Sequence, residues 1–345
     1  MTGHRRLTLA APPPDPFGER RRAAWSVRLQ LLGGRFEFET DSRALLRIVH
    51  SAYARLPAHR LAAVAPRFRV RLALGPAAPE RAAAAMHAAD PSPVWPLSGG
   101  GMLCGALQSA TFAALNPEQG SALIVVSRDM LRHAYHIRYE LLEFAVYVLA
   151  ARGQGLVPLH AACLGQRGEG LLLIGSSGSG KSTLVLHGLL AGLDFLAEDS
   201  VLVNPEGLLA TGLANYLHLR RDSLRFLARP ERGSLLRNAT LIRRRSGIEK
   251  LEIDLRDLPC HLARAPQRLR AVAFISRRHT RNGVLLEPLK PSAVLERISA
   301  TQRYAAHQPG WAAFRRQLLQ LPAYELRRAE HPRTAIEAVR ELLAE

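Results

Sequence analysis

Residues 171–183 place a glycine-rich loop between an apolar run and a stretch of helical pattern, and this feature constrains the fold most. The run Leu171-Leu172-Leu173-Ile174 predicts a buried strand, and G-x-x-x-x-G-K-S follows it directly. Glycines let a backbone wrap around phosphate groups, while successive N–H groups and the first turn of the next helix face the anion. The order strand–loop–helix therefore predicts an α/β fold with a phosphate-binding loop. The residues expected to bind phosphate are Gly175, Ser176, Ser177, Gly178, Ser179, Gly180, Lys181, Ser182 and Thr183.

Three positions of this loop have distinct expected roles. Lys181 is expected to reach the terminal phosphates of a nucleotide, Ser182 to ligate Mg²⁺ through its hydroxyl, and Thr183 to contact the first phosphate. Lysine is rare in this chain, because 44 of the 47 basic residues are arginine and the three lysines are Lys181, Lys250 and Lys290. A compact ammonium suits position 181. Lys250 is interpreted as a surface residue at a strand edge.

An acidic pair, Glu198-Asp199, begins 17 residues beyond Lys181, after one predicted helix and a short strand. This spacing would place two carboxylates beside the terminal phosphate, one to hold Mg²⁺ and one to take a proton from an attacking hydroxyl. His160 precedes Lys181 by 21 residues, in the first strand of a predicted hairpin (157–164 and 170–174). Such a hairpin returns His160 toward the acidic pair. Spacing alone leaves open a purely structural role for this histidine.

Two classes of nucleotide-binding protein do not fit the chain. A GTPase needs an N-K-x-D motif to recognise its base, and the sequence contains none. A transporter-type ATPase carries LSGGQ after its phosphate loop. Here Leu97-Ser98-Gly99-Gly100 lies about 75 residues before the loop, so the order is wrong and we interpret the match as coincidence.

The composition limits the partners and the compartment. The net charge is +18, but the arginines are scattered, and an arginine- and alanine-rich composition indicates a general bias rather than nucleic-acid binding. The arginine cluster at 243–245 is interpreted as solvated surface. The alternative is that it supplies positive charge to the phosphate-binding site. Three cysteines without metal-ligand spacing favour a reducing cytoplasm, and no apolar run reaches membrane-spanning length.

The chain divides into four predicted regions. Residues 1–24 are a flexible basic arm, and 25–155 a small α+β domain without a catalytic motif, in which 75–101 is a long loop and 128–152 a helix. Residues 156–290 contain the phosphate loop, and 291–345 form a mainly helical carboxy-terminal extension. Within the first domain, alternation around Gly33-Gly34 predicts a hairpin, and Asp41 or Ser42 is expected to cap a helix.

Residues 156–203 resemble the catalytic domain of HPr kinase/phosphorylase. The likeness is carried by L-H-A-x-C at 159–163, the glycine-bearing turn, the phosphate loop, and the acidic pair preceded by Phe-Leu-Ala. The chain is most similar to the HPr-kinase-related (type A) proteins found beside peptide-modification genes. GGRFEFETDSRALLRIV, GIEKLEIDLRDLP and PAYELRRAEHPRTAIEAVREL extend that likeness.

The resemblance implies a P-loop kinase fold of the HPr kinase and phosphoenolpyruvate carboxykinase type, with ATP, Mg²⁺ and a serine acceptor. It implies that Glu198 stands at the position of the catalytic carboxylate, usually an aspartate, and that Asp199 is the Mg²⁺-side or histidine-linked acid. His160 becomes a site residue on the same grounds. The G-R-N run of HPr kinases is not clearly present, so the resemblance implies neither recognition of HPr itself nor phosphorylase activity.

The leading hypothesis is therefore transfer of the γ-phosphoryl group of ATP to a serine, or a threonine, of a protein or peptide. Two alternatives stay open: a nucleotide-gated peptide- or protein-binding module with slow hydrolysis, and a small-molecule kinase. The sequence also leaves open the identity of the acceptor and of the phosphate donor. It leaves open the oligomeric state, and a homo-oligomer is one of the possibilities.

Overall fold

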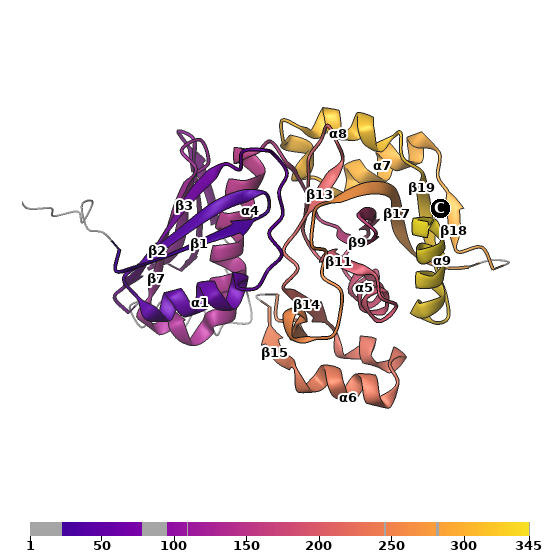
Figure 1. Ribbon diagram of the computed structural model, residues 1–345, viewed down its shortest axis with the longest axis horizontal. Helices are drawn as coiled ribbons and strands as arrows, with labels where there is room; N and C mark the ends of the chain where they lie inside the picture. Colours follow the sequence, from indigo (N-terminus) through magenta and orange to yellow (C-terminus); the bar gives the residue numbers. More distant parts are fainter. Residues whose placement is uncertain (1–22, 78–94, 109, 245, 281–282, 345) are drawn as a thin grey trace, which may run out of the picture.

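The computed structural model describes residues 23–77, 95–108, 110–244, 246–280 and 283–344, which form a mixed α/β structure with two main sheets side by side (Figure 1). Most of the expected amino-terminal arm, residues 1–22, lies outside this description. So do residues 78–94 of the expected long loop. No helix in the described ranges has the length and apolarity needed to cross a bilayer.

The amino-terminal part is a seven-stranded sheet covered by helices, in the order β1-β2-β3-β7-β6-β5-β4. The predicted hairpin and the predicted helix are confirmed, and the Oγ of Ser42 caps α1 by accepting from the N–H of Leu45 at 3.4 Å. The bounds are β1 Trp25–Leu31, β2 Gly34–Thr40, α1 Arg43–Tyr53, β3 Arg67–Gly75, β4 Trp95–Gly99, β5 Met102–Gln108, β6 Thr111–Asn116 and β7 Ser121–Ser127.

Two predictions for this part are wrong. Residues 95–99 form strand β4 rather than a loop, and strands β5 and β6 were not expected. The sequences of these strands show little alternation of apolar and polar residues. Pairing with neighbouring strands therefore holds them in the sheet. The expected single helix over 128–152 is divided. A 3₁₀ turn (η1, Arg128–His133) and a short α3 (Ala134–His136) lead into a π-helical turn (η2, Ile137–Leu142) and then α4 (Glu143–Gly153).

The second main sheet carries the phosphate loop. Its order is β11-β9-β10-β17-β13-β12-β8, and β19 pairs with β17 and β18. Strand β10 runs parallel to β17, which runs parallel to β19. The bounds are β8 Val157–Leu159, β9 Ala162–Gln166, β10 Glu169–Ile174, β11 Asp194–Ala197, β12 Val201–Val203, β13 Leu209–Thr211, β17 Gln267–His279, β18 Leu286–Pro288 and β19 Ala323–Arg328.

Helices cover both faces of this sheet (Figure 1). On β10, Leu171 and Leu173 pack in the core that includes α5 and α9, whereas Leu172 and Ile174 pack in the core that includes α7 and α8. This alternation explains the continuous apolar run, because a strand buried on both faces needs no polar side. The helices are α5 Lys181–Leu190, α7 Pro291–Thr301, α8 Trp311–Leu318 and α9 Pro332–Ala344, with a 3₁₀ turn (η5) at Ala305–His307.

Residues 291–344 belong to the same layered structure as the phosphate loop. They contain strand β19, which was not predicted, and β19 joins the sheet beside β17. A smaller sheet has the order β14-β16-β15, and its strands β14 and β15 lie below and to the left of α5 in Figure 1. Its bounds are β14 Tyr216–Leu219, β15 Ala239–Arg243 and β16 Glu249–Asp254, with η3 Arg221–Phe226 and α6 Arg229–Arg237 between β14 and β15 and η4 Leu255–Asp257 after β16.

Candidate functional site

The loop between β10 and α5 has the geometry of an anion cradle. Gly178 and Gly180 have φ angles of +74° and +105°, which L side chains rarely adopt. No side chain caps the start of α5, so its first N–H groups face outward. A Cβ added to Gly180 would meet no atom within 4 Å, so the space beside the backbone is open. These features suit a phosphate group at the helix start.

The loop lines a cavity of about 610 Å³. Residues 176–183 line this cavity, whereas the carbonyl of Gly175 accepts from the buried Nζ of Lys181 at 2.6 Å. The hydroxyl of Ser179 is buried without a hydrogen-bond partner. All nine predicted loop residues are thus gathered at one end of the cavity or directly behind it.

His160 links the lysine to the acidic pair. Nζ of Lys181 lies 3.4 Å from Nε2 of His160, and Nδ1 lies 3.1 Å from the backbone oxygen of Asp199 and 3.3 Å from its Oδ1. Since the ammonium can only donate, Nε2 accepts and Nδ1–H donates to Asp199. Burial lowers the pKa of Lys181 more than the two carboxylates raise it.

The position of His160 corrects the predicted hairpin. His160 lies in a break between β8 and β9, and these two strands pair with different neighbours in the sheet. The side chain of Gln302 takes the place of the strand pairing that the backbone of His160 lacks. It accepts from the N–H of His160 at 2.8 Å and donates to its carbonyl at 3.1 Å. The break lets the imidazole point into the cavity instead of into a sheet face.

Glu198 is buried against the phosphate loop. The hydroxyl of Ser182 donates to Oε1 of Glu198, and the N–H of His218 donates to Oε2 at 3.1 Å. Burial by itself would raise the pKa of Glu198. The hydrogen bond and positive charge of His218 outweigh burial and hold that pKa below its usual value. Glu198 is therefore an ionised carboxylate beside the loop hydroxyl.

Asp199 faces the cavity and has different partners. Its Oδ2 accepts from the hydroxyl of Tyr139 at 3.2 Å and lies 3.5 Å from a guanidinium nitrogen of Arg244. Burial would raise the pKa of Asp199, but His160 first, then Arg244 and the lysines, hold it below its usual value. Asp199 is thus ionised, 30% exposed, and joined to His160.

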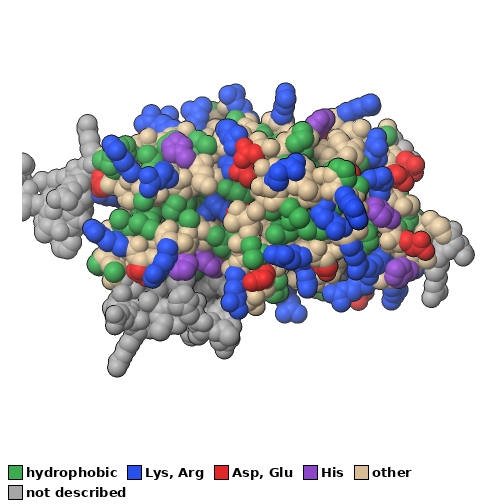
Figure 2. Space-filling model, turned by 90° about the horizontal axis from the view of Figure 1, so that it is seen from below, with side chains coloured by type: hydrophobic (Ala, Val, Ile, Leu, Met, Phe, Trp, Pro, Cys, Tyr) green, Lys and Arg blue, Asp and Glu red, His purple; other side chains and the backbone are tan. Residues whose placement is uncertain are grey.

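The wall around the loop is strongly basic. The surface interpretation is wrong for Arg244 and Lys250, which both line the cavity, whereas Arg243 is exposed and residue 245 lies outside the described ranges. Burial lowers the pKa of Lys250, and the nearby Arg244 lowers it further. Elsewhere, basic side chains are scattered over the face seen in Figure 2. The cationic lining residues are Lys181, Arg220, Arg225, Arg244, Lys250, Arg277, Arg327 and Arg328.

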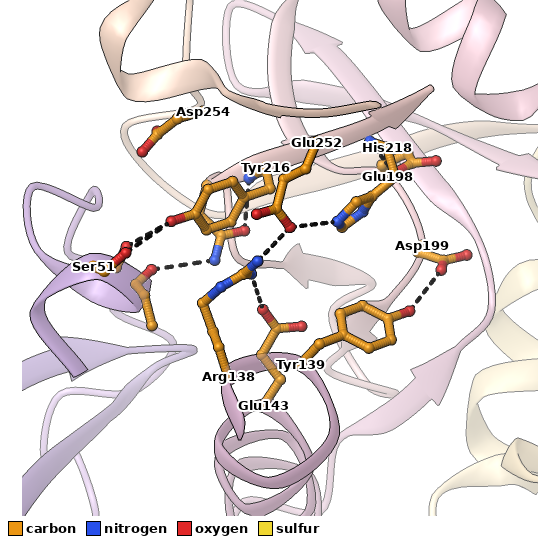
Figure 3. A network of polar contacts seen from close by, with 12 residues as sticks. Ser51, Arg138, Tyr139, Glu143, Glu198, Asp199, Tyr216, His218, Glu252 and Asp254 are labelled. Atoms are coloured by element: carbon orange, nitrogen blue, oxygen red, sulfur yellow. Dashed lines mark hydrogen bonds and ion pairs between the residues drawn. The ribbon is translucent and has the colours of Figure 1, made fainter. Parts of the chain in front are cut away.

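A buried ionic network reaches the site from the amino-terminal part (Figure 3). Arg138, on the π-helical turn, contacts Glu143 at 3.3 Å and also pairs with Glu252 on β16. Nε2 of His218 lies 2.9 Å from the same Glu252 carboxylate, and Nδ1 lies 3.6 Å from Glu198. Burial would lower the pKa of His218, but the two glutamates raise it above its usual value and so favour the protonated ring.

We expect Arg138→Met to destabilise the protein by about 3–5 kcal/mol, because it removes the buried cation from Glu143 and leaves Glu252 with His218 as its partner. The Arg138 side chain is only 4% exposed and also stacks 3.9 Å from the centre of the Tyr216 ring. Urea unfolding measures the change. Arg132→Met, at an exposed arginine of η1, is the matched control and should alter stability by less than about 0.5 kcal/mol. Equal stabilities of the two variants would contradict the structural importance of the network.

We expect the wild-type protein to lose folding stability as pH rises from 4.5 to 7, and Glu143→Gln to lose less over the same range. Burial raises the pKa of Glu143 from 4.5 to about 7, so the folded protein binds this proton more tightly than the unfolded chain. The contribution of this group to folding stability is fully present below pH 4.5 and is lost as pH rises through about 7. The total loss is roughly 3 kcal/mol. Urea titrations across this range compare the variant with wild type and with Glu118→Gln, at an exposed position. Parallel curves for all three proteins would show that Glu143 has an ordinary pKa.

The donor atoms present suit a nucleotide with Mg²⁺. In the described part of the chain, no three His, Cys, Asp or Glu side chains form a metal cage. Mg²⁺ needs no such cage, since it is usually held by one or two protein oxygens together with phosphates and water. The Ser182 hydroxyl and the Glu198 carboxylate already touch and supply two such oxygens. Asp199 was predicted as the Mg²⁺-side or histidine-linked acid, and its oxygens lie near His160, Tyr139 and Arg244, which agrees with the second of these roles.

Among the site residues that sequence reasoning missed are Arg138, Tyr139, His218 and Glu252. One signal was available, because charged residues alternate with apolar ones along β16 and this places Lys250 and Glu252 on the same face. The register then sets His218 opposite Glu252 across the β14–β16 ladder. Arg138 and Tyr139 carried no comparable signal, since they interrupt an apolar helical pattern.

The chain was compared with protein-family models and with curated proteins, and it matches none of them.

Proposed function

We propose that this protein is an ATP- and Mg²⁺-dependent kinase of the HPr-kinase-like type that phosphorylates a serine or threonine hydroxyl of a protein or peptide. One observation carries the proposal: an ionised carboxylate, Asp199, and an imidazole, His160, converge with Lys181 at the mouth of a phosphate-loop cavity. A protein that merely bound nucleotide would need the cradle but no such carboxylate. The resemblance of residues 156–203 to HPr kinases agrees with this chemistry.

The two carboxylates divide the work in the opposite way to the sequence interpretation. Glu198 shares its oxygen with the Ser182 hydroxyl, the position at which a P-loop enzyme holds its metal. Mg²⁺ bound there would neutralise charge on the phosphates. Asp199 faces the cavity and accepts the proton of the attacking hydroxyl as the new O–P bond forms and the bond to the leaving ADP breaks. His160 positions Asp199 through its Nδ1–H.

The basic wall stabilises the transferring group. Lys181 contacts the terminal phosphates, and the amides of the loop face the same oxygens. Arg244 and Lys250 line the same cavity and would add positive charge where negative charge builds up late in transfer. Two of the three lysines of this arginine-rich chain, Lys181 and Lys250, belong to the cationic lining.

Incubation with γ-labelled ATP, Mg²⁺ and candidate acceptors tests the proposal, with proteins and peptides encoded near this one as the first candidates. A stable phosphoserine or phosphothreonine in wild type supports it. Nucleotide-dependent capture of a partner without phosphate transfer would replace the kinase by a binding module. A labelled metabolite with no labelled protein would indicate a small-molecule kinase.

A further inference from the structure

A second cavity of about 620 Å³ meets the nucleotide cavity at the reactive groups. Both cavities are lined by His160, Glu198 and Asp199, and beyond these three residues their linings differ. The second cavity extends between the π-helical turn with α4 and residues 301–305 after α7. The catalytic carboxylate is thus reachable from two directions.

The two cavities have opposite chemical character. The nucleotide side has six arginines and two lysines in its wall. The second cavity has five aromatic side chains, one arginine, Arg303, and the rings of His160 and His218. Its four acidic residues outnumber these three basic ones: Glu140, Glu143, Glu198 and Asp199. Phosphate groups are favoured on the first side, whereas the second side favours apolar and neutral or cationic groups and disfavours anions.

Both walls of the second cavity are hydrogen-bonded to the reactive residues or to their neighbours in the chain. The hydroxyl of Tyr139 donates to Asp199 at 3.2 Å, and that of Tyr147 donates to the backbone oxygen of Ser200 at 3.4 Å. On the other wall, Gln302 holds both backbone groups of His160. Figure 3 shows Tyr139 reaching from its helical turn toward Asp199. A molecule lying between these walls would have its hydroxyl beside Asp199.

We propose that this second cavity binds the phosphate acceptor, and that the acceptor is a peptide segment whose serine or threonine is flanked by aromatic or aliphatic residues and by basic rather than acidic ones. The inference rests on the proposed kinase function and deepens it. It also gives the amino-terminal part a role, because its π-helical turn and α4 form one wall of the acceptor site.

A peptide fits this cavity better than a small metabolite does. The rim is open where Thr301, Arg303 and Tyr304 are exposed, and the Tyr304 side chain is 55% exposed. An enclosed pocket covers most of the surface of a small ligand, whereas an extended chain enters and leaves an open cleft. Exposed tyrosines at such a rim are typical contacts for a bound segment.

The test uses the full-length protein, [γ-³²P]ATP with Mg²⁺, and a positional-scanning library of peptides with a central serine. We expect apolar and basic flanking residues to be selected, and acidic ones to be phosphorylated at least about tenfold less. With the best library peptide, Tyr304→Ala should raise the acceptor KM about tenfold and leave the KM for ATP within about twofold. The Kd of the same peptide, fluorescently labelled and measured by anisotropy without nucleotide, should rise by a similar factor.

Val284→Ala is the matched control, because Val284 is 52% exposed and lines neither cavity. Transfer to peptides with acidic flanks, or a Tyr304→Ala variant with unchanged peptide KM and Kd, would overturn the acceptor site and leave the kinase proposal intact. If a metabolite is labelled and no peptide is, the proposal that the acceptor is a peptide would be wrong. A wild-type protein that neither binds ATP nor transfers phosphate to any acceptor would refute the kinase function itself, and the acceptor site with it.

Discussion

Replacing Lys181 by alanine is expected to lower phosphoryl transfer by about a thousandfold or more, because the variant loses the ammonium aimed at the transferring phosphate in a partly buried site. Lys181 is only 7% exposed, and its Nζ is held by the Gly175 carbonyl and His160. Single-turnover labelling with ATP and an acceptor measures the loss, and nucleotide titration measures binding.

Two further lysine variants make this result specific. Lys290→Ala changes an exposed lysine before α7 and should keep the wild-type rate. Lys181→Arg should remain impaired, since a planar guanidinium does not replace a compact ammonium in the loop. A folded Lys181→Ala protein with undiminished transfer would show that the phosphate is activated elsewhere.

Asp199→Asn is expected to reduce transfer about 10²- to 10⁴-fold while nucleotide affinity stays near that of wild type, because an amide cannot accept the proton of the attacking hydroxyl. Glu198→Gln should act differently. It weakens the oxygen ligand next to Ser182, so the Mg²⁺ concentration needed for half-maximal activity should rise about tenfold or more.

Rates measured over a range of Mg²⁺ concentrations separate these two roles. Asp199→Asn should not be rescued by added Mg²⁺, whereas Glu198→Gln should be rescued in part. The reverse pattern, with Glu198→Gln inactive at every Mg²⁺ concentration and Asp199→Asn transferring normally, would restore Glu198 as the base and overturn the assignment made from the hydrogen bonds.

Sequence reasoning was most successful where the structural information is local. The hairpin at Gly33-Gly34, the Ser42 cap and the order strand–loop–helix all depend on residues a few positions apart. It was least successful where pairing partners are distant. β4, β5 and β6 are held by their ladders with one another and with β7, and β19 is a strand because β17 lies beside it. Their own side chains alternate too weakly to indicate this.

What the sequence determined by itself is the glycine-rich loop between a strand and a helix, together with an acidic pair and a histidine at spacings that allow them to meet it. The tertiary structure decided how these groups are used. Glu198 and Asp199 directly follow β11, where the chain bends, and their side chains point to different partners. One carboxylate meets Ser182 and the other His160, and only the packing of β11 against the loop decides which. The same packing brought in Arg244, Lys250 and the Arg138 network, whose positions depend on strands and helical turns far away in the chain.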